Sequence, residues 1–181
     1  MGDLRGRRAA IIVADEFEDL VLFYPMYRLQ EEGIQIVVVG FNEKPVKGKH
    51  EYSITPDKTI DQVSANEFDF LVVPGRKSPE RLRLNSSILE FVWEFDRRGK
   101  PIAAICHAGQ VLASAGILIG RRMTCVESIR DDMMNAGANY ANAPVVRDRN
   151  LVTSLTPKDL ADFGRQMVQV FSEPLTVAVS G

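Results

Sequence analysis

The chain has 181 residues, of which 45% are hydrophobic and 25% charged, and its formal net charge is −2 at pH 7. Such a chain can bury a core without disulfides or structural metals, so we expect a single domain over residues 1–181, with a core from about 8 to 171 and a short tail over 172–181. Its basic residues are interspersed with acids, which excludes a basic surface for a phosphate backbone, and we expect no nucleic-acid partner.

The N-terminal apolar run, residues 9–14, is too short for a signal peptide or a membrane span. The two cysteines, Cys106 and Cys125, form no CxxC pair, and His50 and His107 are the two histidines. This pattern argues against a disulfide framework or a zinc site. We therefore expect a cytoplasmic protein with no membrane association.

Short apolar runs alternate with amphipathic segments along the chain. Strands are predicted over residues 8–14, 34–39, 70–73 and 101–105, with a strand pair over 144–147 and 151–154. Helices are predicted over 15–33, 87–99, 108–115, 128–136 and 157–171. Pro25 predicts a kink or break in the first helix. The alternation indicates a doubly wound α/β fold, a flavodoxin-like three-layer sandwich with a mostly parallel central sheet.

Ligands of such sheets bind at the carboxyl ends of the strands. The run over 101–105 leads directly into Cys106 and His107, where a strand-to-helix turn presents a nucleophile to solvent. Free N–H groups at the start of the next helix favour the thiolate and are expected to lower the pKa of the thiol. We predict that Cys106 is the reactive thiol and that Cys125 is a small buried hydrophobic residue.

A second strand end carries Gly75 and Arg76, where a tight turn leaves backbone N–H groups for a developing oxyanion. Glu80 follows at a helix start, where dipole complementarity is the favoured interpretation. The third strand end holds four acids, and the residues alone do not decide which of them faces inward: Asp15, Glu16, Glu18 and Asp19. His50 lies in a polar loop and is expected to be exposed.

From about residue 9 to residue 171 the chain resembles the PfpI family of intracellular peptidases and stress-response proteins, in the superfamily that includes the DJ parkinsonism protein. The resemblance rests on ordered motifs at residues 16–19, 48–53, 79–81, 104–107 and 131–137. It implies that Cys106 is the nucleophile, that His107 is its base, and that Glu18 is a protonated carboxyl in contact with the thiolate. A retained proton avoids contact between two anions.

The resemblance also implies that Glu80 reaches His107 of the partner subunit. The protein would then be a homo-oligomer, a dimer or higher, with the active site at the interface. It further implies an enzyme that needs no metal or organic cofactor. The expected substrates are reactive dicarbonyls such as methylglyoxal, or their adducts, as in glyoxalase III or a deglycase. Cys106 would attack the carbonyl while N–H groups near Gly75, Arg76 and His107 hold the oxyanion.

Three residues depart from the family pattern. Arg76 stands where the family has a glycine, so a positive φ would carry a steric cost, and its guanidinium could bind a carboxylate or oxoacid. Ala108 replaces a glycine and narrows the strand-to-helix turn at Cys106. Val126 replaces the tyrosine that peptidase relatives carry near the thiol, which removes a possible hydroxyl donor.

Two alternatives remain open at this stage. One is a PfpI-type peptidase, whose peptide substrate needs a roomier site and a well-formed oxyanion hole. The other is a redox-sensing or chaperone-like stress protein in which Cys106 is oxidised rather than turned over. Glutamine amidotransferase chemistry lacks support because no His-x-Glu follows late in the chain.

Overall fold

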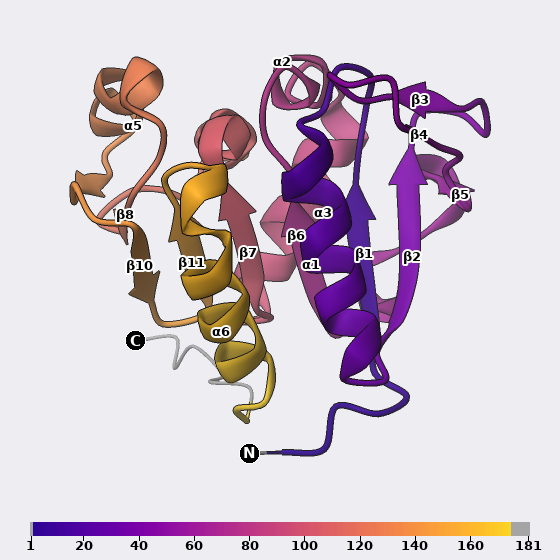
Figure 1. The fold of residues 1–181 in the computed structure, drawn as a ribbon. Helices are drawn as coiled ribbons and strands as arrows, with labels where there is room; N and C mark the ends of the chain where they lie inside the picture. Colours follow the sequence, from indigo (N-terminus) through magenta and orange to yellow (C-terminus); the bar gives the residue numbers. More distant parts are fainter. Residues whose placement is uncertain (1, 175–181) are drawn as a thin grey trace.

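The computed structural model describes residues 2–174 and shows a central seven-stranded sheet in the order β10-β11-β7-β6-β1-β2-β5 (Figure 1). Neighbouring strands pair in parallel, except that β10 and β11 form an antiparallel hairpin. The predicted doubly wound α/β architecture is confirmed. The strands are β1 Arg8–Ile12, β2 Gln35–Gly40, β5 Lys58–Thr59, β6 Phe70–Val73, β7 Ile102–Ile105, β10 Val145–Asp148 and β11 Leu151–Ser154.

Helices cover both faces of the sheet, because its central strands are apolar on both sides. Along β1, Ala9 and Ile11 face one hydrophobic cluster, while Ala10 and Ile12 face the other. The first cluster lies under α1 (Asp19–Glu31) and α6 (Leu160–Phe171), and the second under α3 (Ser86–Arg97) and α4 (Gly109–Ser114). The result is the expected three-layer sandwich.

Several predicted boundaries shift in the structure. The first helix begins at Asp19 rather than at residue 15 and runs unbroken through Pro25, whose missing N–H leaves the Val21 carbonyl without an intrahelical donor. Of the predicted kink or break at Pro25, the break is therefore wrong. The helices expected over 128–136 and 157–171 each open with a 3-10 turn, Glu127–Ile129 before α5 (Arg130–Asn135) and Pro157–Asp159 before α6.

Two small sheets were not predicted, since two-residue strands show no periodicity. They are the antiparallel pair β3 (Val46–Lys47) and β4 (Ser53–Ile54) and the parallel pair β8 (Arg122–Met123) and β9 (Asn139–Tyr140). Of the expected tail, residues 175–181 lie outside the described residues. No helix within residues 2–174 is long and apolar enough to cross a bilayer.

The order of the strands brings three loops together. The chain passes from β1 to β2 on one side and then crosses to β6 on the other side of β1, which makes a topological switch point at the carboxyl ends of β1 and β6. β7 lies next to β6, so its carboxyl end joins the same edge (Figure 1). The segments after β1, β6 and β7 carry all three groups of candidate residues.

Candidate active site

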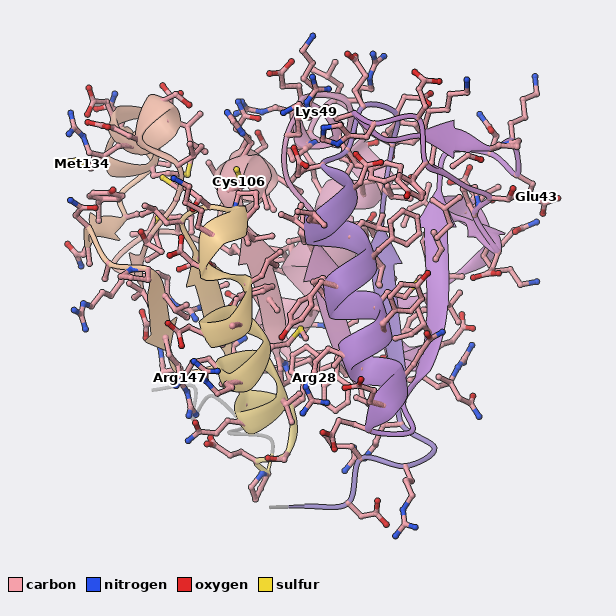
Figure 2. All side chains as sticks on the ribbon, in the orientation of Figure 1. Arg28, Glu43, Lys49, Cys106, Met134 and Arg147 are labelled. Atoms are coloured by element: carbon pink, nitrogen blue, oxygen red, sulfur yellow. The ribbon has the colours of Figure 1, made fainter. Side chains whose placement is uncertain are left out.

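Cys106 occupies a strained turn between β7 and α4. Its φ is 64°, in the left-handed region that non-glycine residues rarely adopt, and a 3-10 turn over Cys106–Ala108 leads into α4. The side chain is half-buried and lies at the carboxyl end of β7 (Figure 2). This is the geometry of the predicted nucleophile elbow.

The backbone N–H groups of His107 and Arg76 lie close enough to the Cys106 thiol to favour its ionised form. Burial acts against them and raises the pKa of the thiol, and the nearby charge of Glu18 raises it further. The balance leaves the Cys106 pKa above its ordinary value. The expectation of a lowered pKa was therefore wrong in direction, because the loss of solvent at Sγ outweighs the two donors.

Gly75 contributes by lacking a side chain. A Cβ at this position would lie 2.6 Å from the Cβ of Cys106 and 2.6 Å from the Ile105 carbonyl oxygen. The absence of that atom lets the end of β6 pass directly against the elbow. The Gly75 carbonyl also accepts a hydrogen bond from the backbone N–H of Glu18 at 3.4 Å, which joins the loops after β1 and β6.

Arg76 has φ 72°, so the positive φ considered for this position is present. Its side chain is 30% exposed, and Nη1 lies 3.9 Å from Oε1 of Glu16. Glu16 is held more closely by Lys77 at 3.3 Å and Arg81 at 2.5 Å. These two cations hold the pKa of the Glu16 carboxyl below its ordinary value.

The imidazole of His107 lies between the side chains of Cys106 and Ser128. Nδ1 is 3.7 Å from Sγ of Cys106, and Nε2 is 3.2 Å from Oγ of Ser128. Burial lowers the pKa of His107, and the charge of Glu80 opposes this while that of Arg76 reinforces it. A lowered pKa keeps the ring neutral at pH 7, as a general base requires. Sequence reasoning did not single out Ser128, which no motif or spacing marks.

Glu80 lies in the short helix α2 (Ser78–Leu82), and it is exposed. Within residues 2–174 its carboxylate has no hydrogen-bond or ion-pair partner, and it acts on His107 of its own chain through charge alone. One chain therefore brings Cys106 and His107 into contact but leaves the Glu80 carboxylate unengaged.

The four acids after β1 have four different surroundings. Asp15 accepts a hydrogen bond from the Lys47 N–H at 2.9 Å, and Glu16 binds the basic residues described above. Asp19 is 5% exposed and accepts a hydrogen bond from the His50 N–H at 2.9 Å. Glu18 is the acid whose charge acts on Cys106, and 13% of its side chain is exposed. The structure thus distinguishes acids that the sequence could not.

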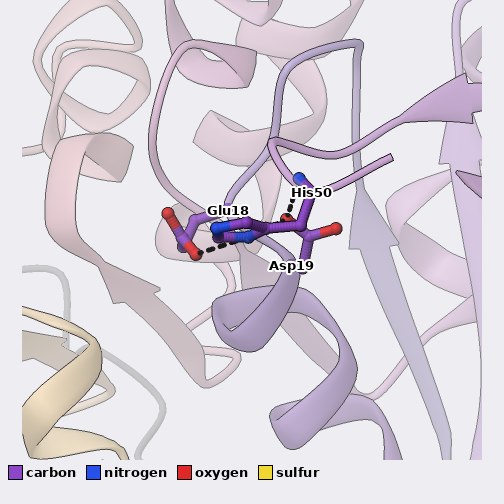
Figure 3. Close-up of side chains that lie close together, drawn as sticks. All are labelled: Glu18, Asp19 and His50. Atoms are coloured by element: carbon purple, nitrogen blue, oxygen red, sulfur yellow. Dashed lines mark hydrogen bonds and ion pairs between the residues drawn. The ribbon is translucent and has the colours of Figure 1, made fainter. Parts of the chain in front are cut away.

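His50 is exposed, as expected, but its ring packs against two of these acids (Figure 3). Nδ1 lies 3.2 Å from Asp19 Oδ2 and 4.0 Å from Glu18 Oε1. The ligand atoms of these three side chains lie within 4.8 Å of one another, so this group could hold a metal ion. Lys49 Nζ, 3.8 Å from Glu18 Oε2, already places a positive charge there.

The remaining sequence predictions concern the surroundings of the thiol. Cys125 is 1% exposed, which confirms it as a buried residue, and burial raises its pKa to about 12. Ala108 is fully buried behind the elbow. The backbone N–H of Val126 lies 3.5 Å from the Cys106 carbonyl oxygen, so the segment that lacks the family's tyrosine does border the nucleophile.

Comparison with known proteins agrees with this geometry. Residues 7–170 match the DJ-1/PfpI family. Deglycase PfpI of Pyrococcus furiosus is 46% identical over 157 residues, which cover 87% of this chain and 95% of that protein. Protein/nucleic acid deglycase 2 of Escherichia coli is 40% identical over 167 residues, 91% of this chain and 97% of that protein. The crystal structure of Drosophila melanogaster DJ-1beta superposes with a TM-score of 0.85 at 28% identity, covering 96% of this chain and 92% of that one. The chain belongs to the DJ-1/PfpI family.

Proposed function

We propose that this protein is a cysteine enzyme that acts on reactive dicarbonyls or on their adducts, as a deglycase or a glyoxalase of the cofactor-independent kind. The observation that carries the proposal is Cys106 at φ 64° with the N–H groups of His107 and Arg76 directed at its thiol. The deglycase names of the relatives support the substrate class. The catalytic residues are Cys106, His107 and Glu18, completed by Glu80.

The reaction begins when His107 Nδ1 accepts the thiol proton and Sγ adds to the aldehyde carbon of methylglyoxal. The two N–H groups that face Sγ are placed to hold the oxygen of the adduct. The proton on the former aldehyde carbon then moves to the neighbouring carbonyl carbon through an enediol, which leaves a thioester. Water hydrolyses the thioester and releases lactate and the free thiol, so the net change is methylglyoxal plus water to lactate.

Glu80 enters this scheme through a partner subunit. Its carboxylate is exposed and has no ion-pair partner within residues 2–174, which supports a role across an interface. The working protein is then a cytoplasmic homo-oligomer in which Glu80 of one chain contacts His107 of the next. Mixing the inactive variants Cys106→Ser and Glu80→Gln tests this, since a mixed interface contains one intact site. Recovered activity supports the shared site. If no activity is recovered, Glu80 acts on His107 of its own chain.

One observation disfavours the peptidase, and turnover separates the enzyme from a sensor, because a sensor thiol is oxidised without multiple turnover. A peptidase requires a strong oxyanion site, and Val126 supplies no hydroxyl beside the elbow. The deciding experiment measures lactate formed from methylglyoxal without glutathione or added metal. We expect lactate from the wild type and none from Cys106→Ser. Equal inactivity of both proteins would overturn the proposal.

A further inference from the structure

Arg76 lies in the loop whose backbone N–H faces the Cys106 thiol, and its guanidinium makes one long ion pair with Glu16. Within residues 2–174 its side chain donates no hydrogen bond, although it is only 30% exposed and carries five N–H donors. Its nearest carboxylate oxygen, on Glu16, is 3.9 Å away, which is beyond hydrogen-bond length. A half-buried arginine with free donors at an active site lacks the acceptor that such a group ordinarily has.

Glu16 is not that acceptor, because it is already occupied. Arg81 and Lys77 bind its two oxygens and account for its lowered pKa, to which Arg76 makes no contribution. The charge of Arg76 also reaches His107, where burial is the main cause of the lowered pKa and Arg76 adds to it. The guanidinium therefore lies within electrostatic reach of a proposed catalytic residue while its hydrogen-bond donors are not used by Glu16.

The backbone at this position is fixed firmly enough to hold a strained arginine. Arg76 has φ 72°, and its backbone pairs with Phe17 in an isolated antiparallel bridge. Lys77 N–H also donates to the Glu16 carbonyl at 3.2 Å. A glycine would meet the backbone requirement without strain, so the backbone gives no reason for an arginine here. The side chain is what distinguishes this residue from a glycine.

We infer that Arg76 binds a carboxylate of the substrate, so that the preferred substrates are 2-oxoaldehydes that carry a carboxylate. The inference rests on the proposed function and narrows its substrate class. One edge of a guanidinium matches one carboxylate with two parallel hydrogen bonds. A single negative charge suits the site because the neighbouring cations, Lys77 and Arg81, are neutralised in part by Glu16.

The chemistry is that proposed for methylglyoxal. With 4,5-dioxopentanoate as the probe, Sγ of Cys106 adds to the aldehyde carbon, and the proton on that carbon moves to the adjacent ketone carbon. The aldehyde carbon is oxidised to a thioester while the ketone carbon is reduced to an alcohol. Water then cleaves the thioester and gives 2-hydroxyglutarate and the free thiol, so no external oxidant is needed.

The test compares 4,5-dioxopentanoate with its methyl ester, which has the same reacting groups and no negative charge. For the wild type we expect kcat/KM for the acid to exceed that for the ester about tenfold or more, mainly through KM. Arg76→Gly, which suits the positive φ and keeps the N–H, should bring this ratio to about one. Arg76→Lys, which keeps charge without the planar fork, should give an intermediate ratio.

Lys77→Gln is the matched control, because it removes an adjacent positive charge that binds Glu16 and should keep the wild-type ratio. A ratio near one in the wild type, or an equal loss in Arg76→Gly and Lys77→Gln, would overturn the inference while methylglyoxal turnover still upheld the function. Failure of the wild type on all three aldehydes would instead overturn the proposed function and this inference with it.

Discussion

The two cysteines lie in adjacent segments, one after β7 and one after β8, yet the backbone around their thiols differs. The segments touch, since the Val126 N–H lies 3.5 Å from the Cys106 carbonyl oxygen. Cys106 has φ 64°, and two backbone N–H groups act to lower the pKa of its thiol. Cys125 is buried among apolar residues, and its pKa rises to about 12.

Burial raises the pKa of both thiols, although Cys106 is half-buried and Cys125 is 1% exposed. They also differ in their donors, since the N–H groups of His107 and Arg76, from the loops after β7 and β6, act on the Cys106 sulfur and no backbone N–H of residues 2–174 acts on the Cys125 sulfur. We therefore expect exposure and the two N–H groups together to make Cys106 the reactive thiol.

The largest expected effect is the contrast between the two cysteine substitutions. Cys106→Ser should lower dicarbonyl turnover by about 10⁴-fold or more, because a serine hydroxyl is a far weaker nucleophile at this pH. Cys125→Ala should keep turnover within about threefold of wild type while lowering stability by roughly 1 kcal/mol. Lactate formation and thermal unfolding measure the two effects. Comparable losses of activity from both changes would contradict the distinction.

The fold and the elbow were predictable for the same reason. Runs that are apolar on both faces, such as residues 70–73 and 101–105, predict central parallel strands. The end of such a strand then locates the site, and Cys106 follows β7 immediately. The direction of the Cys106 pKa was not predictable, since the solvent lost at Sγ depends on loops that only the folded chain brings together.

Gly75→Ala tests whether the elbow needs the close approach of β6. The new Cβ would lie 2.6 Å from the Cβ of Cys106, so the chain must shift and the Arg76 N–H must move away from Sγ. We expect kcat/KM to fall about 10²-fold, as when an oxyanion donor is removed. Gly6→Ala, at φ 78° with open space around it, is the control that should lose stability and keep activity. Unchanged turnover in Gly75→Ala would show that the approach is dispensable.

Glu18→Gln removes the charge that raises the Cys106 pKa. The pH dependence of alkylation by iodoacetamide should therefore move to lower pH, since the thiolate forms more readily. Asp15→Asn, whose carboxylate accepts a hydrogen bond from the Lys47 N–H, is the matched control and should cause no movement. A movement to higher pH would instead show that Glu18 carries a proton and donates it in a hydrogen bond to the thiolate.

The acids after β1 show where prediction from sequence ends. Four carboxylates lie within five residues, yet one binds a backbone N–H, one binds lysine and arginine side chains, one binds His50, and one acts on the thiol. The orientation of these side chains depends on the backbone of Glu16, which adopts φ 63°, and on loops near β3, α2 and β7. Sequence spacing does not predict where those loops lie, so only the family resemblance selected Glu18.

The smallest expected effect concerns Ser128, in the segment after β8 that also carries Cys125, and its contact with the Cys106 site. Ser128 Oγ lies 3.2 Å from His107 Nε2, and a proton on Nε2 donated to this oxygen leaves Nδ1 free to accept the thiol proton. Ser128→Ala should therefore lower kcat by about two- to tenfold, and Ser128→Thr should restore it, because a hydroxyl hydrogen bond contributes about 1 kcal/mol. If Ser128→Ala has full activity while Glu80→Gln does not, Nε2 takes its partner from Glu80 in the assembled protein. The segment after β8 would then contribute only packing, and the hydrogen-bond partner of His107 Nε2 would come from another chain.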